Sequence, residues 1–203
     1  GELAKEIKTS EDGKAITFIL RDNVKFHDGK PFTSADVKYT FDELFRTKGY
    51  KSFAFYDTVN KAPVAHIISI DTPDAGTVVF NLARPELKNQ LLSNLVAIPI
   101  ISQGSSSQIK AAPVGTGPFK FVSFDQSQNT VDLAAFPDYW EGGPKVAKLR
   151  VKTVTDASAL QAELQTGGVD LAPVPSNLPP DSLKQLGALP NLKVEQFDGS
   201  NIQ

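Results

Sequence analysis

The feature that most constrains this chain is the way turn residues divide its apolar residues into short segments. Residues 15–21 follow a turn signal at 11–13 and have a length typical of a β-strand. Pro99 interrupts the longest apolar candidate, residues 95–101, so no run approaches the roughly 18–20 residues of a membrane span. The pattern predicts a globular protein of short strands and amphipathic helices.

The first helix is predicted to begin after Thr33, whose hydroxyl suits an N-cap. Asp36, three residues on, completes a capping box, and Phe32 and Val37 are placed for a hydrophobic staple. We expect Gly49 to end this helix. Its apolar face comprises Val37, Phe41, Leu44 and Phe45.

Other elements follow from the same signals. In the first half we expect a strand at 24–26, antiparallel strands at 65–70 and 77–82, a helix from Pro85 and a flexible boundary at 104–107. In the second half we expect a hairpin of 119–124 and 130–135, a strand at 148–154, a helix capped by Thr155 and ended by Gly167, a strand at 169–172, a helix at 181–186 and a strand at 192–197. This order predicts α/β layering in the second half.

Charge and residue usage exclude several classes of protein. Lysine and arginine number 21 against 23 acidic residues, a net charge of −2, which argues against a nucleic-acid partner. With no cysteine, disulfides and thiolate metal sites are ruled out. His27 and His66 are the only histidines and fit no metal motif, and His27 is interpreted as a histidine beside a turn. We therefore expect no metal site, no cofactor and no catalytic residues, and so not an enzyme.

Aromatic residues and glycines offer the only candidate binding features. Tyr50, Phe53, Phe55 and Tyr56 cluster in a segment of small and polar residues, where they either line a pocket or fold back on the core. Trp140 is interpreted as a ring that clamps a turn onto a sheet. The Gly115-Thr116-Gly117 stretch lacks the spacing of a phosphate-binding loop.

Several stretches in a fixed order carry a specific resemblance. Residues 17–37 (TFILRDNVKFHDGKPFTSADV), 113–119 (PVGTGPF), 136–140 (FPDYW) and 168–171 (GVDL) resemble signature segments of the family 5 bacterial extracellular solute-binding proteins. These are the dipeptide-, oligopeptide- and nickel-binding proteins of ABC importers. The resemblance spans nearly the whole chain.

The resemblance implies one lobe of a two-lobed periplasmic-binding-protein fold, of mixed α/β class, with mixed sheets and flanking helices. Residues 1–110 resemble the accessory subdomain, and 111–203 an incomplete ligand-facing α/β subdomain; the second lobe is missing from this chain. The implied function is solute binding for an importer, for peptides in particular, outside the cytoplasmic membrane with or without a lipid anchor. The implied partners are a small peptide or other solute and an ABC transporter permease.

The ligand-binding residues that the resemblance leaves in this chain are Phe55, Tyr56, Gly115, Thr116, Gly117, Ser200 and Asn201. Since hinge closure needs both lobes, we expect the chain alone to bind solutes weakly or not at all. The alternatives are a sensory or chaperone-like binding module on the same scaffold and, with less support, a hydrolase.

Overall fold

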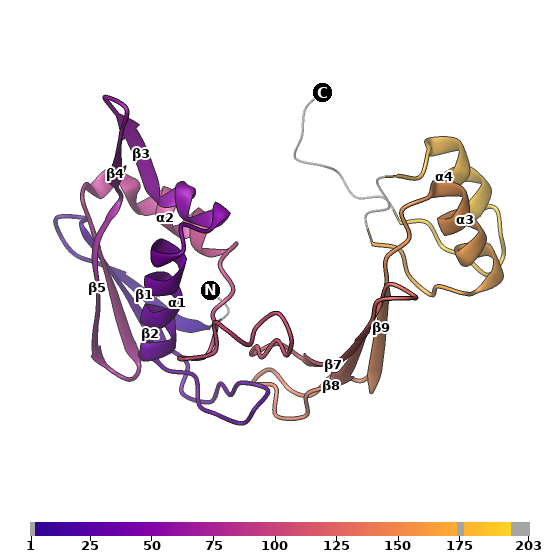
Figure 1. The fold of residues 1–203 in the computed structure, drawn as a ribbon, viewed down its shortest axis with the longest axis horizontal. Coiled ribbons are helices and arrows are strands. Elements are labelled where there is room, and N and C mark those ends of the chain that lie inside the picture. The colour runs from indigo at the N-terminus through magenta and orange to yellow at the C-terminus, as the bar shows by residue number, and fades with distance from the viewer. Residues whose placement is uncertain (1–2, 174–176, 196–203) are drawn as a thin grey trace. The chain divides into compact units, whose positions relative to one another are not determined.

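The computed structural model describes residues 3–173 and 177–195 (Figure 1). The chain divides into two compact units, which are described separately. Unit 1 comprises Gly1–Phe124 and Val131–Arg150, and unit 2 comprises Asp125–Thr130 and Val151–Gln203. The expected division at residue 110 concerns the subdomains of the resembled family and stays a prediction.

Unit 1 is built on a four-stranded antiparallel sheet of order β1-β2-β6-β5, covered by helix α1 (Figure 1). Its first elements are β1 (Ala4–Thr9), β2 (Ala15–Leu20), α1 (Ser34–Arg46), the 3-10 helix η1 (Tyr50–Phe55), β3 (Tyr56–Val59), β4 (Ala62–Ala65), β5 (Ile67–Asp74), β6 (Thr77–Leu82), the 3-10 helix η2 (Pro85–Leu87) and α2 (Lys88–Leu95). The expected pairing of the strands near 65–70 and 77–82 is confirmed, and so are the strand at 15–20 and the helix after Pro85.

The core of unit 1 forms because alternate residues of the central strands face the apolar side of α1. Val78, Phe80 and Leu82 of β6 are buried at every second position, as a strand with one covered face requires. Phe41 of α1 is fully buried and meets Phe80 edge to face, with ring centroids 5.1 Å apart. This aromatic contact joins helix and sheet.

The expected start of the first helix is confirmed, whereas its end differs. Thr33 is the N-cap and forms a capping box with Asp36. The helix stops at Arg46, three residues before Gly49, because Lys48 takes the left-handed conformation with φ 49°. A lysine thus ends the helix where we expected a glycine.

One further expectation about elements was wrong, and three strands were not expected. Residues 24–26 form only an isolated bridge, Lys25 with Pro31, since the turn that follows is too close for a ladder. Strand β1 and the β3–β4 hairpin were not expected, because their side chains are mostly exposed and lack an alternating apolar pattern. The hairpin turns through Asn60 and Lys61, both with positive φ, where the sequence carries no glycine.

A three-stranded sheet of order β7-β8-β9 belongs for the most part to unit 1. Its strands are β7 (Phe119–Asp125), β8 (Thr130–Ala135) and β9 (Lys148–Lys152), which confirms the expected hairpin and the following strand. Asp125 shapes the hairpin turn, since its Oδ1 accepts hydrogen bonds from the backbone N–H groups of Ser127 and Gln128.

The described part of unit 2 contains two helices, α3 (Ala157–Thr166) and α4 (Pro180–Gly187), packed against each other. Its small core consists of Leu160, Leu164, Leu178 and Leu186. Asp156, not Thr155, caps α3, because its carboxylate accepts from the N–H of Ala159 at 2.7 Å. Gly167 ends the helix with φ 74°, as expected.

The expected strand at 169–172 is absent from the structure, and residues 192–195 are not in a strand either; residues 196 and 197 lie outside the described residues. A strand needs a hydrogen-bonded neighbour, and the described part of unit 2 offers these segments none. No helix in the described part of the chain is long and apolar enough to cross a membrane.

Candidate functional site: a glycine loop held by His27

Residues 113–118, here named the glycine loop, precede β7 and are held by one histidine. The N–H of Gly115 donates to His27 Nδ1 at 3.2 Å, and His27 Nε2 lies 2.9 Å from the carbonyl oxygen of Gly117. The backbone N–H of His27 also donates to the carbonyl oxygen of Gly115 at 2.9 Å. Three hydrogen bonds therefore join segments that are almost ninety positions apart in the sequence.

The segment after β8 packs against His27 and the glycine loop. The ring of Phe136 meets the His27 ring edge to face, with centroids 5.1 Å apart, and the N–H of Phe136 donates to the carbonyl oxygen of Pro118. Lys25 pairs with Asp138 at 3.1 Å. The structure thus brings together the stretches around residues 27, 115 and 136.

Trp140 continues this contact. The Arg21 guanidinium carbon lies 4.3 Å from the centroid of its ring, a cation–π arrangement. The half-buried indole packs against the core of unit 1. Our interpretation of Trp140 as a clamp that holds a turn onto a sheet agrees with this packing.

The backbone conformation of the loop does not require glycine at positions 115 and 117. The glycines with positive φ in the described chain lie elsewhere, at positions such as Gly13 and Gly29. A Cβ at Gly115 would meet the His27 ring at an ordinary 3.6 Å. A Cβ at Gly117 would have no described atom within 4 Å. Gly117 therefore lies beside open space that the described residues do not fill.

Some polar groups of the glycine loop make no hydrogen bond to His27. Within the described residues, the N–H groups of Thr116 and Gly117 and the Thr116 hydroxyl make no hydrogen bond to protein. All three loop residues 115–117 are half-buried. They can offer donors to an acceptor group such as a carbonyl or a carboxylate.

The other expected ligand-binding residues lie elsewhere. Phe55 is 1% exposed and packs edge to face on Phe41 and Phe45, so its ring is part of the core of unit 1. Tyr56 is half-buried against Phe45 and pairs with Ala65 in the β3–β4 hairpin. Of the two alternatives for the aromatic cluster, Phe55 follows the one in which rings fold back on the core.

Ser200 and Asn201 lie outside the described residues. The role of these two residues and of the glycine loop in solute binding stays a prediction.

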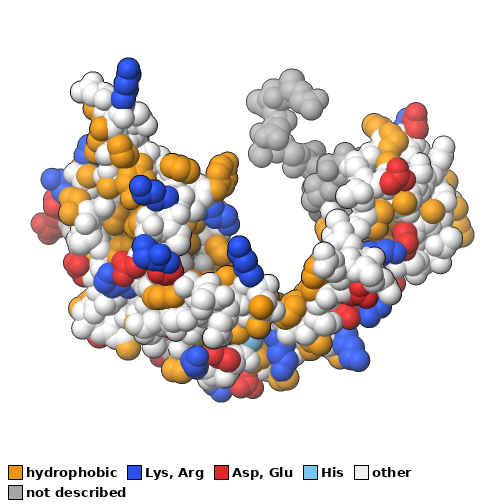
Figure 2. All heavy atoms as spheres, in the orientation of Figure 1, with side chains coloured by type: hydrophobic (Ala, Val, Ile, Leu, Met, Phe, Trp, Pro, Cys, Tyr) orange, Lys and Arg blue, Asp and Glu red, His pale blue; other side chains and the backbone are white. Residues whose placement is uncertain are grey.

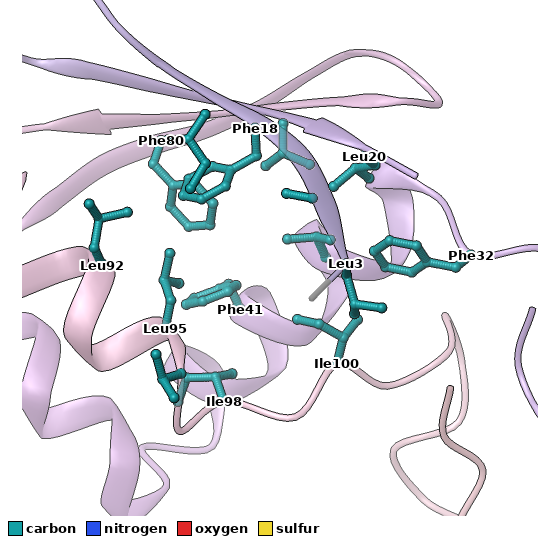
Figure 3. A pocket seen from close by; sticks show the side chains of 15 residues that line it. Leu3, Phe18, Leu20, Phe32, Phe41, Phe80, Leu92, Leu95, Ile98 and Ile100 are labelled. Carbon is teal, nitrogen blue, oxygen red and sulfur yellow. The ribbon is translucent and has the colours of Figure 1, made fainter. Parts of the chain in front are cut away.

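An apolar hollow of unit 1 lies away from the glycine loop, between the sheet and helices α1 and α2 (Figure 3). Its volume is about 530 Å³, and all its lining residues are apolar, among them Phe18 and Phe80 of the sheet, Leu92 and Leu95 of α2 and Ile98. An apolar hollow offers no group to hold a charged or polar solute. It belongs to the core of unit 1.

A second polar cluster surrounds the buried His66. Its Nε2 lies 3.0 Å from Asp57 Oδ1 without a directed hydrogen bond, and Arg84 pairs with the other oxygen of Asp57 at 2.6 Å. His66 and then the Arg84 guanidinium hold the pKa of Asp57 below its ordinary value. Among the described residues, no group of three or more histidine, cysteine, aspartate or glutamate side chains could hold a metal ion. This cluster fastens β3 to the start of β5.

The sequence pattern indicates the glycine loop but not the residue that anchors it. From the sequence, His27 is interpreted only as a histidine beside a turn. The useful signal was present, since His27 lies in one resembled stretch and the loop in another. Sequence order could not show that the two stretches touch.

Comparison with known proteins defines the class of protein. The chain matches solved structures of binding proteins that hold small ligands. Across 93% of the chain, a binding protein, AgaA, in complex with agropinic acid from A. tumefaciens R10 is 30% identical with a TM-score of 0.77. DppA from Helicobacter pylori in complex with the peptide STSA is 27% identical over 93% of the chain, with a TM-score of 0.71. The fold is that of a periplasmic binding protein, which confirms the expected fold class.

The family model for bacterial extracellular solute-binding proteins, family 5, middle region, matches residues 1–203, and the chain belongs to this family. A putative ABC transporter peptide-binding protein of Brucella ovis is 38% identical over 186 residues, covering 87% of this chain. The chain spans 34% of the length of that relative, and 37% and 40% of the two structures. The resemblance of the signature stretches is thereby confirmed.

Proposed function

We propose that this chain is part of one lobe of a solute-binding protein of an ABC importer, and that the whole protein captures a peptide between two lobes. The observation that carries the proposal is the family match over residues 1–203, together with relatives named as peptide-binding proteins. The whole protein then works outside the cytoplasmic membrane, delivers its solute to a permease and performs no catalysis.

The glycine loop supports the proposal within this chain. Peptides carry carbonyl oxygens and a carboxylate, and the N–H groups of Thr116 and Gly117 are donors without a protein partner among the described residues. Gly117 leaves room beside the loop, since a Cβ there would have no described neighbour within 4 Å. Open space next to unused donors suits the approach of an acceptor.

Surface charge fits a small solute better than a nucleic acid. On the face in Figure 2, basic and acidic side chains are interspersed, in keeping with a net charge of −2. A nucleic-acid partner would favour a continuous basic patch.

The test is a retention experiment on the full-length protein. The protein is mixed with di- to pentapeptides, a nickel–histidine complex and agropinic acid, passed through a gel-filtration column and examined by mass spectrometry. We expect one or more intact peptides to be retained, and binding by calorimetry to be far weaker for the 203-residue chain alone, since closure needs the second lobe.

Three outcomes would contradict parts of this proposal. Retention of only the nickel complex or agropinic acid would exclude peptides as the solute. Cleaved peptides in the eluate would show an enzyme. Retention of nothing by the full-length protein would overturn the solute-binding function.

A further inference from the structure

His27 satisfies the glycine loop through both of its ring nitrogens at once. Nδ1 lies 3.2 Å from the N–H of Gly115 and must accept, whereas Nε2 lies 2.9 Å from the carbonyl oxygen of Gly117 and must donate. Only the neutral imidazole with its proton on Nε2 meets both demands. The loop therefore determines one tautomer of His27.

The ring cannot easily turn away from this position. Phe136 packs edge to face on it, and the Phe136 backbone is itself bonded to Pro118 at the end of the loop. The backbone N–H of His27 adds the third bond, to the carbonyl oxygen of Gly115. Side chain and backbone of one residue thus hold both glycines from the same side.

These bonds use the groups of Gly115 and Gly117 that face His27 and leave those between them unused. The N–H of Thr116, its hydroxyl and the N–H of Gly117 have no partner among the described residues. A loop fixed at two points presents its remaining donors in one arrangement, which lowers the entropic cost of binding an acceptor.

We propose that His27 is a positioning residue, which holds the glycine loop so that the N–H groups of Thr116 and Gly117 receive a carbonyl or carboxylate oxygen of the solute. The role rests on the proposed function, because it concerns the same binding site. His27 does not touch the solute and acts only through the loop.

The test compares His27 variants of the full-length protein. His27→Phe keeps a ring against Phe136 and removes both side-chain hydrogen bonds, while His27→Gln carries an acceptor and a donor and restores part of them. Lys25→Met is the matched control, since it removes the nearby pair with Asp138 and leaves the loop bonds intact. The probe is the peptide bound most tightly in the retention experiment.

We expect His27→Phe to weaken peptide binding by about tenfold or more and His27→Gln by less, with melting temperatures close to wild type. Amide hydrogen exchange at Gly115 should accelerate in His27→Phe, because its N–H loses its acceptor. Nitrogen-15 spectra of the wild type should show His27 protonated at Nε2 and not at Nδ1. Lys25→Met should change none of these readouts.

Unchanged peptide affinity in His27→Phe, beside normal binding by the wild type, would overturn the positioning role and leave the proposed function standing. A proton on Nδ1 would overturn it as well. If the wild type binds no solute, the proposed function itself fails. Should His27→Phe not fold, His27→Leu takes its place with the same expected loss of affinity.

Discussion

At the scale of single residues, a few buried side chains connect elements that the sequence separates widely. Phe41 is the clearest case, since its ring contacts Phe45, Phe55 and Phe80 with centroid distances of 5.1–5.9 Å. The helix, η1 and the sheet therefore share one aromatic side chain.

Phe41→Ala should destabilise unit 1 strongly. The substitution leaves a cavity among rings from three elements, and such losses cost about 3–5 kcal/mol. The free energy of unfolding, determined in urea, measures this loss of stability. Phe53→Ala is the matched control, because Phe53 is 66% exposed on the neighbouring 3-10 helix and should change stability by no more than about 0.5 kcal/mol. Equal effects would contradict the packing described here.

Asp36 combines two tasks in one buried carboxylate. Its Oδ2 accepts from the N–H and the hydroxyl of Thr33 at the start of α1, and its Oδ1 accepts from the N–H of Gln103 at 2.8 Å. The capping box, predicted from the sequence, also fastens the segment that leads to the glycine loop.

Asp36→Asn should lower the free energy of unfolding by about 1–3 kcal/mol, because the amide nitrogen cannot accept and leaves a buried N–H group without a partner. Asp42→Asn on the same helix is the control. It breaks only the exposed pair with Lys38, which is worth about 0.5 kcal/mol or less. The free energy of unfolding of both variants is measured by chemical denaturation. Equal losses of stability in the two variants would argue against the double role of Asp36.

At the scale of elements, the end of α1 is stabilised by an ion pair that makes its stability depend on pH. Both oxygens of Glu43 accept hydrogen bonds from Arg46 at 2.8 Å. This pairing with Arg46, followed by Ser106, lowers the pKa of Glu43 from 4.5 to about 2.

Because the pKa of Glu43 is lower in the folded chain than in the unfolded one, its contribution is complete above pH 4.5 and is lost as the pH falls toward 2. The melting temperature should therefore decline less steeply between pH 5 and 3 in Glu43→Gln than in wild type. Arg46→Gln should flatten the curve in the same way. Parallel curves for all three proteins would refute the assignment.

At the scale of the whole molecule, the chain consists of two units with separate cores. Unit 1 has a large core around α1 and the four-stranded sheet, whereas unit 2 relies on four leucines between α3 and α4. Small cores give little stability, so unit 2 should be the first part to lose its structure.

Leu186→Ala should unfold unit 2 selectively, because Leu186 is 2% exposed and supplies a quarter of its buried leucines. Hydrogen exchange should rise throughout α3 and α4 and stay unchanged in β2 and β6. Leu171→Ala, at a leucine of the same unit that is 74% exposed, should leave both units protected. Loss of protection in β6 would show that the two cores fold together.

Local patterns in the sequence determined most elements of unit 1 and the family of the chain. The capping box at Thr33 and Asp36, the alternation in β6 and the leucine face of α3 each involve residues a few positions apart, and short-range geometry decides them. The signature stretches were equally readable, since they are runs of consecutive residues.

Only the tertiary structure decided which distant groups meet. Phe55 belongs to the core and not to an open site because Phe41 and Phe45 surround it, and His27 serves the glycine loop because the fold brings Gly115 and Gly117 to its ring. Hydrogen bonds and ring contacts act over a few ångströms, so their partners depend on the folded path of the chain and not on its order.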